Sequence, residues 1–238
     1  MTQSRLPIAT LALLSAIFCF SSASAQTNDR AQAVREFEDL LGKVQALENR
    51  LLGVPDEDKA AFAGFLKQPN TGLIRLLPRD KYDHRLAING GGAYYSFVRL
   101  THEYGRGADI ELNEGSFRVG FVGVSYGFLG FLGDMALDSV SLDHPGVAFL
   151  TEFKPPSAEA EVRAVGQKTY YGFQAGDYSY KRYLTAVPEK TYVLRSIDYH
   201  EGYDVLIAFH VVRRDADGSL VLVWKKLKDF QPPHLERQ

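Results

Sequence analysis

The clearest structural signal in the chain runs from Asp204 to Leu227 and reads DVLIAFHVVRRDADGSLVLVWKKL. Two apolar runs, Asp204–Arg213 and Ser219–Leu227, flank a short polar segment that ends in Gly218. A glycine at this place suits the left-handed position of a bulged hairpin loop, so the pattern predicts an antiparallel β-hairpin. Both alternating faces of the two runs are apolar, which is typical of central strands that are covered on both sides.

Similar short runs, rich in β-branched and aromatic residues, recur along the second part of the chain between glycine, proline and acidic residues. About nine to eleven such runs, without alternating long helices, predict a mainly β fold, either an antiparallel β-sandwich or a partly closed barrel. We expect Val147–Phe153 to be one of the strands. Lys154–Gly166 contains two adjacent prolines and predicts a long exposed loop.

The first 25 residues have the pattern of a secretory signal peptide. Arg5 supplies the positive start, Ile8–Phe20 forms an apolar run, and Ala23–Ala25 gives a small-residue cleavage site. We therefore expect an exported protein, periplasmic or extracellular. The apolar run is too short to span a bilayer comfortably and no later stretch approaches the length required, so we expect no transmembrane segment in the mature chain.

Composition limits both the partners and the sources of stability. The only cysteine, Cys19, lies in the predicted signal peptide, so the mature chain is cysteine-free and gains nothing from disulfides. The formal net charge of −2 argues against a nucleic-acid partner. We expect no bound cofactor.

The chain is expected to divide into three parts: a signal peptide over 1–25, a helical N-terminal segment over 26–81 and an all-β domain over 82–238. Within the helical segment, a second short helix is expected over 57–68. Asp56 is its predicted cap, because a side-chain oxygen just before a helix can accept from the first free backbone amides.

The main helix of that segment is predicted between a cap at Asp29 and a stop at Gly53. Apolar residues from Val34 to Leu51 recur at steps of three and four, which places them in one stripe. Such a stripe fits a helix that packs on its own domain. It also fits a coiled coil, so dimerisation through residues 29–52 stays open.

Gly123-Val124-Ser125-Tyr126-Gly127 matches the G-x-S-x-G nucleophile elbow of serine hydrolases. The elbow needs glycines because its turn is too tight for side chains, and it needs a following helix, an acid and a histidine. The spacing of the later aspartates and histidines selects no such partners. A glycine-rich strand with bulges or close backbone packing is the favoured explanation of the motif. A secreted serine hydrolase that uses Ser125 is therefore the alternative function.

Possible metal ligands are densest around His102, Glu103, Asp109 and Glu111. A hairpin between them could bring His102 near one of the two later carboxylates. No recognised ligand spacing is present, and solvated turn charges beside a strand-end histidine are the favoured explanation of the cluster. His102, Asp109 and Glu111 are thus candidate ligands, and we expect no metal site.

Tyrosine is concentrated between Tyr170 and Tyr203, interleaved with lysine and arginine. Exposed tyrosines combine an apolar ring with a polar tip and suit sugar stacking or protein contact, although aromatic residues also pack across strands. The predicted ligand-binding residues are Tyr178, Tyr180, Tyr183 and Arg182. The sequence therefore favours an exported, non-catalytic binding or structural protein, with a carbohydrate, another envelope component or a protein as its partner.

Three stretches carry a resemblance: Gly90–Phe97, Thr101–Gly105, and Val211–Ser219 with Trp224–Lys225. Together they resemble a family of uncharacterised secreted bacterial proteins, over most of the chain after about residue 70. The resemblance implies a bacterial exported protein. It implies no catalytic or binding residue, because no activity is assigned to that family.

Overall fold

The computed structural model describes residues 11–121 and 123–236, with side chains from Asp29 onward. Residues 1–10, where the predicted signal peptide begins, lie outside the described residues. The chain divides into two units, of which the first ends at Arg50 and the second begins at Leu51. Within the part that the structure describes, no helix combines the length and the apolar character needed to cross a membrane.

The first unit is formed by helix α1 (Leu11–Leu52), which ends directly before the predicted stop at Gly53. The apolar stripe is exposed on this helix: Phe37 is 65% exposed, Leu40 59% and Leu47 50%. A helix over the predicted residues is therefore present, but it begins at Leu11, so Asp29 lies inside the helix and is not its cap. Whether the apolar stripe packs on the chain's own domain or on a second copy of the helix stays a prediction.

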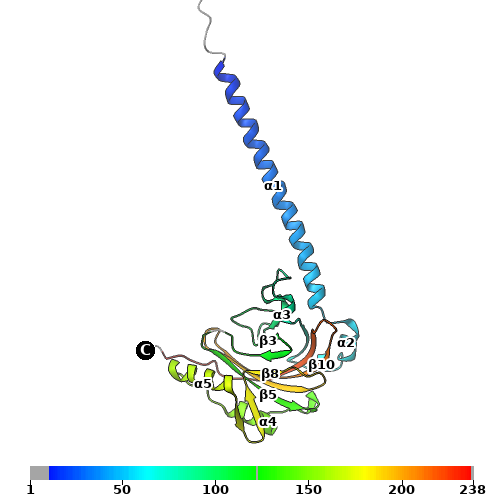
Figure 1. Ribbon diagram of the computed structural model, residues 1–238, viewed down its shortest axis with the longest axis vertical. Helices are drawn as coiled ribbons and strands as arrows, with labels where there is room; N and C mark the ends of the chain where they lie inside the picture. Colours follow the sequence, from blue (N-terminus) through cyan, green and yellow to red (C-terminus); the bar gives the residue numbers. More distant parts are fainter. Residues whose placement is uncertain (1–10, 122, 237–238) are drawn as a thin grey trace, which may run out of the picture. The chain divides into compact units, whose positions relative to one another are not determined.

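Seven antiparallel strands form the larger sheet of the second unit (Figure 1). In spatial order they are β1 (Thr71–Leu76), β11 (Leu220–Asp229), β10 (Tyr203–Arg214), β9 (Thr191–Asp198), β5 (Ser125–Gly133), β7 (Tyr178–Lys181) and β6 (Phe173–Ala175). β10 and β11 are the predicted final hairpin, and Gly218 has the positive φ, 90°, that its loop requires. The prediction of this hairpin is confirmed.

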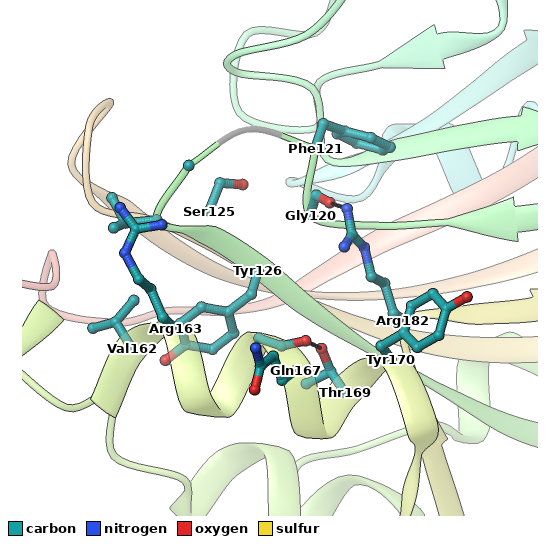
Figure 2. Close-up of a pocket in the computed structure, with 13 residues that line it drawn as sticks. Gly120, Phe121, Ser125, Tyr126, Val162, Arg163, Gln167, Thr169, Tyr170 and Arg182 are labelled. Carbon is teal, nitrogen blue, oxygen red and sulfur yellow. Dashed lines mark hydrogen bonds between the residues drawn. The ribbon is translucent and has the colours of Figure 1, made fainter. Parts of the chain in front are cut away.

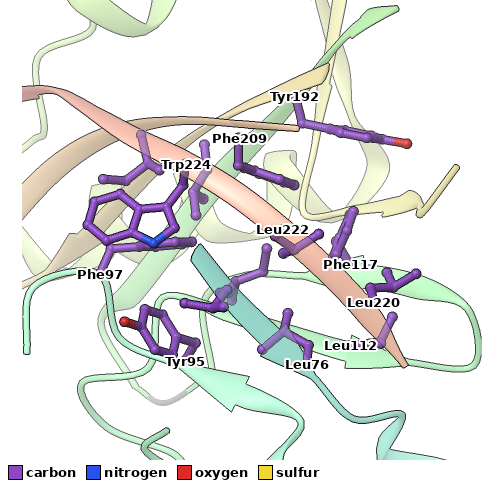
Figure 3. Packing of buried hydrophobic residues seen from close by; sticks show 14 of the residues in the cluster. Leu76, Tyr95, Phe97, Leu112, Phe117, Tyr192, Phe209, Leu220, Leu222 and Trp224 are labelled. Carbon is purple, nitrogen blue, oxygen red and sulfur yellow. The ribbon is translucent and has the colours of Figure 1, made fainter. Parts of the chain in front are cut away.

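A second, smaller sheet packs on one face of the larger one. Its strands, in order, are β2 (Tyr94–Tyr95), β3 (Ile110–Asn113), β4 (Ser116–Arg118) and β8 (Tyr183–Thr185). Both sheets contribute to one buried apolar cluster (Figure 3), which includes Leu76, Leu112, Phe117, Tyr192, Phe209, Leu222 and Trp224. The sheets do not close into a barrel, so the mainly β sandwich is confirmed and the barrel alternative is not.

Helices cover the other face of the larger sheet. A second apolar cluster joins β5, β9 and β10 to α4 (Pro145–Glu152) and α5 (Glu159–Tyr171), and the residues around α2 (Asp56–Ala61) and the 3-10 turn η2 (Phe65–Lys67) pack against it. β10 supplies both clusters, because Ile207 and Phe209 belong to the first and Leu206 and Ala208 to the second. The central strands are thus covered on both sides, as their sequence predicted.

Two expectations about this helical layer were wrong. Val147–Phe153 is not a strand, because α4 covers most of it; the side chain of His144 caps the first turn by accepting from Gly146 N at 3.1 Å, and Pro145 occupies the first helical position. Lys154–Gly166 is not a continuous loop, because α5 begins at Glu159, where alanine and glutamate favour a helix.

The start of the second unit also differs from the expectation. β1 is already an edge strand of the larger sheet, so the boundary expected near residue 82 falls inside a compact unit. The second helix is shorter than 57–68, since α2 ends at Ala61. Asp56 is its first residue rather than its cap, and Pro55 precedes it.

A fully buried ion pair joins β9 and β10. Arg195 donates to both carboxylate oxygens of Asp204, with Nε–Oδ1 at 2.8 Å and Nη2–Oδ2 at 2.6 Å, and the two side chains are 1% and 0% exposed. Arg195 Nη1 donates to the backbone oxygens of Leu150 and Phe153 at the end of α4, and the guanidinium lies 3.8 Å from the ring centroid of Phe230. The Arg195 side chain therefore connects β9 to β10, to the end of α4 and to the C-terminal segment at Phe230.

A second buried charge, Asp109, precedes β3. Its Oδ2 accepts from the backbone nitrogen of Phe97 at 2.6 Å, and the side chain is fully buried. Burial raises the pKa of Asp109 to about 6. The native protein therefore holds a proton on this carboxyl more tightly than the unfolded chain does.

We expect Arg195→Met to lower the free energy of unfolding by about 3–5 kcal/mol, because it leaves the Asp204 carboxylate buried and unpaired. Urea unfolding followed by circular dichroism measures this. The control is Arg163→Met, since Arg163 is 60% exposed beside Glu159 and should cost less than about 1 kcal/mol. Equal losses in the two variants would contradict a central role for the buried pair.

Asp109→Asn tests the second buried charge. Because the pKa is about 6 in the native protein and about 3.9 when unfolded, the Asp109 contribution to the free energy of unfolding falls as pH rises between these values. We expect the variant to resemble the wild type near about pH 4 and to exceed its stability by about 1–3 kcal/mol near about pH 8. Parallel curves of stability against pH would show that Asp109 does not titrate in this way.

Candidate functional site

The outer face of the smaller sheet carries a row of four polar or aromatic side chains. Strand pairing sets Tyr94 opposite Glu111, Glu111 opposite Arg118, and Arg118 opposite Tyr183. Directly opposed residues in an antiparallel sheet point to the same face. The row therefore crosses all four strands and forms the floor of a cleft.

The residues beside this row point the other way. Tyr95, Ile110 and Phe117 lie in the apolar cluster between the sheets, while their neighbours Tyr94, Glu111 and Arg118 line the cleft. This follows from the two-residue period of a strand, in which successive side chains alternate between faces. The same short strands thus build both the core and the site.

Residues from elsewhere in the second unit complete the walls of the cleft. They are Arg79 from the short helix α3 (Arg79–Tyr82), Tyr104 from the loop before β3, Phe121 from the loop before β5, Tyr170 from α5, and Arg182 before β8. The space enclosed is about 710 Å³. We call it the aromatic cleft, because five of its lining residues are tyrosine or phenylalanine.

A buried network fixes the floor. Glu111, 3% exposed, accepts from Arg79 Nη1 and from the Tyr94 hydroxyl, both at 3.0 Å. The Arg79 guanidinium also lies 5.6 Å from the Tyr94 ring centroid. Burial, together with the Glu111 carboxylate, raises the pKa of Tyr94, so its phenol stays protonated and donates to Glu111. Both donors therefore bind the same oxygen of Glu111, Oε1, and hold this carboxylate in place.

The triple-glycine turn η3 (Asn89–Gly92) positions this network. Gly91 has a φ of 61°, and a Cβ there would lie 2.3 Å from the backbone carbonyl carbon of Tyr82. Only glycine allows the turn to approach α3 so closely. The turn thereby sets Arg79, on α3, beside Tyr94, which follows the turn.

A smaller pocket of about 410 Å³ adjoins the aromatic cleft (Figure 2). It shares Phe121, Tyr170 and Arg182 with the cleft, and Arg163 lines it from α5. Figure 2 shows Arg163 and Arg182 on either side of Ser125. We call this space the adjoining pocket.

Arg182 lies at the junction of the two spaces. Its Nε donates to the backbone oxygen of Val119 at 2.9 Å, and its Nη2 donates to that of Gly120. Its own backbone nitrogen donates to Thr169 O at 2.7 Å. The guanidinium is therefore held in place by carbonyl oxygens, which are polar but carry no net charge.

The four predicted ligand-binding residues separate into two pairs. Arg182 and Tyr183 line the aromatic cleft, and Tyr183 is 45% exposed there. Tyr180 is fully buried and its hydroxyl donates to Gly146 O at 3.0 Å, while Tyr178 packs beside His144. Tyr178 and Tyr180 thus hold the start of α4 against the sheet.

Ser125 does not lie in a nucleophile elbow. It is the first residue of β5 and pairs with Asp198, so a strand follows it where the elbow requires a helix. The glycine motif has packing reasons instead: a Cβ at Gly127 would lie 2.9 Å from Arg195 O. The interpretation of a glycine-rich strand with close backbone contacts is confirmed.

The three candidate metal ligands serve separate contacts. His102 Nδ1 lies 2.9 Å from Tyr94 O, Asp109 binds Phe97 N, and Glu111 belongs to the buried network. Among the described residues, no three histidine, cysteine, aspartate or glutamate side chains are grouped to hold a metal ion.

Sequence reasoning missed most of the cleft, namely Arg79, Tyr94, Tyr104, Arg118 and Phe121. One signal was present for Glu111 and Arg118, because each is a charged residue between two apolar ones, as expected for outward positions of short strands.

Comparison with known protein families, with curated proteins and with solved structures found no match to this chain. The function of the aromatic cleft is therefore inferred from its geometry alone.

Proposed function

We propose that this is an exported, non-catalytic binding protein that takes up a saccharide in the aromatic cleft. The observation that carries the proposal is the cleft itself: about 710 Å³ bounded by five aromatic side chains and several hydrogen-bonding groups. Ligand sites are concave, with apolar walls and a few convergent polar groups. The signal-peptide pattern of the sequence supports export.

The lining suits the two kinds of surface that a sugar ring presents. The faces of the ring carry C–H groups that pack against aromatic plates such as the half-exposed Tyr104 and Tyr183, 49% and 45% exposed. The edges carry hydroxyls, which can accept from the guanidinium groups of Arg118 and Arg182 or bond to Ser116. A purely apolar ligand would leave these donors unpaired.

Two features favour binding over catalysis. Glu111 is the one carboxylate among the described residues that line the cleft, and Arg79 and Tyr94 already bind it. Ser125 faces the adjoining pocket from a strand, and in the described part of the chain no histidine is hydrogen-bonded to its hydroxyl. Neither residue is poised to move a proton on a substrate.

We also propose that α1 pairs with a second copy of the chain. The spacing of Val34, Phe37, Leu41 and Val44 matches the alternating three- and four-residue steps of a coiled-coil seam, and these side chains are exposed.

Leu41→Glu should shift the protein toward the monomer in sedimentation velocity, because it places a charge in the seam. Ala46→Glu is the control, since it introduces the same charge on the side of the helix opposite the stripe. A wild-type chain that sediments as a monomer would refute the pairing.

Tyr183→Ala tests the cleft. We expect it to weaken saccharide binding by about 10-fold, since losing one stacked ring removes about 1.4 kcal/mol. Calorimetric titration with a panel of oligosaccharides measures this. Tyr171→Ala is the matched control, because Tyr171 is 81% exposed and lines neither space. Equal effects of the two variants, or no saccharide bound by the wild type, would remove the proposal.

A further inference from the structure

The charge around the two joined spaces is opposite to that of the whole chain. The chain carries a formal net charge of −2, yet Arg79, Arg118, Arg163 and Arg182 line the cleft and the adjoining pocket, against the single carboxylate of Glu111. Clefts lined by one sign of charge raise the local concentration of the opposite ion. The excess of arginine therefore favours an anionic ligand.

The four arginines are not equally neutralised. Arg79 pairs with buried Glu111 at 3.0 Å and with Asp83 at 3.1 Å, so its charge is balanced locally. Arg118 is 3.2 Å from Glu114, which is 71% exposed, and such a pair in water is weak. Arg163 has a similar exposed partner in Glu159.

Arg182 differs from the other three. It is half-buried, and its side-chain acceptors in the described part of the chain are the two backbone oxygens of Val119 and Gly120. Nη1 has no acceptor there. Burial lowers the pKa of Arg182, and repulsion from Arg118 lowers it further, while the Glu111 carboxylate acts in the opposite direction. The group remains ionised, since arginine does not lose its proton in proteins.

We propose that the ligand of the aromatic cleft is an acidic saccharide, a sugar that carries a carboxylate or a phosphate, and that Arg182 and Arg118 bind its anionic group. This inference rests on the proposed function. The planar guanidinium of Arg182 has a free donor edge and is fixed by the 119–120 carbonyls, which suits charge-assisted hydrogen bonds to such a group. Tyr183, the cross-strand neighbour of Arg118, then lies beside the anion to pack on the ring.

The test uses matched sugars that differ by one acidic group: glucose against glucuronate and glucose 6-phosphate, and N-acetylglucosamine against N-acetylmuramate. Binding to the full chain is measured by calorimetry or saturation-transfer NMR. We expect the acidic member of at least one set to bind about 10-fold or more tightly than the neutral one, as charge-assisted hydrogen bonds imply. Added salt should reduce this preference.

Three arginine variants locate the anion. Arg182→Gln and Arg118→Gln should each bring the acidic sugar close to the affinity of the neutral one. Arg85→Gln is the control, because Arg85 is exposed and lines neither space. Since Arg182 also fastens the 119–120 loop, circular dichroism is recorded for each variant, and Arg118→Gln, whose partner is exposed, decides the question if Arg182→Gln fails to fold.

The outcomes separate the two proposals. Equal affinity for neutral and acidic sugars, with loss of both in Tyr183→Ala, would keep the saccharide cleft and overturn the acidic ligand. A preference for acidic sugars that survives both arginine substitutions would also overturn the role of Arg182 and Arg118. Failure of the wild type to bind any member of the sets would overturn both proposals.

Discussion

The central strands of the larger sheet are apolar on both faces, and this constraint shapes the second unit. On β10, Ile207 and Phe209 are buried under the smaller sheet, while Leu206 and Ala208 are buried under the helices. A sheet of this kind is stable only when both faces are covered. The pair of Arg195 and Asp204 is a buried polar exception on the helical side, and it is tolerated because the two side chains bind each other and Arg195 also donates to the carbonyl oxygens at the end of α4.

The smaller sheet covers one face of the larger sheet and keeps its own outer face free. Its strands are only two to four residues long, so each contributes one or two side chains to each face. Phe117 is buried between the sheets while the next residue, Arg118, lines the cleft. The position of the cleft floor is therefore set by the packing of the core, and a change of strand register would turn Arg118 inward.

Local signals account for what the sequence could predict. The β10–β11 hairpin was predictable because alternation and Gly218 lie within one short window. The α4 region was not, since a short apolar run fits a buried strand or a helix, and Pro145 was the one cue for a helix. The cleft lies beyond such reasoning: Tyr94 and Tyr183 are far apart in the chain and are brought together by the pairing of β2, β3, β4 and β8, while the η3 turn adds Arg79.

Some side chains of the aromatic cleft already bind one another, and others are free to contact a ligand. Glu111 is engaged by Arg79 and Tyr94, and the Tyr94 ring makes edge contacts with Tyr104 at 4.9 Å and with Phe121 at 5.2 Å between centroids. The buried network of Arg79, Glu111 and Tyr94 therefore also restrains the two aromatic side chains that contact Tyr94. A site whose walls are fixed before binding loses less conformational entropy when the ligand arrives. In the proposed binding role, the Glu111 carboxylate would act indirectly, by holding Tyr94 against the rings of Tyr104 and Phe121.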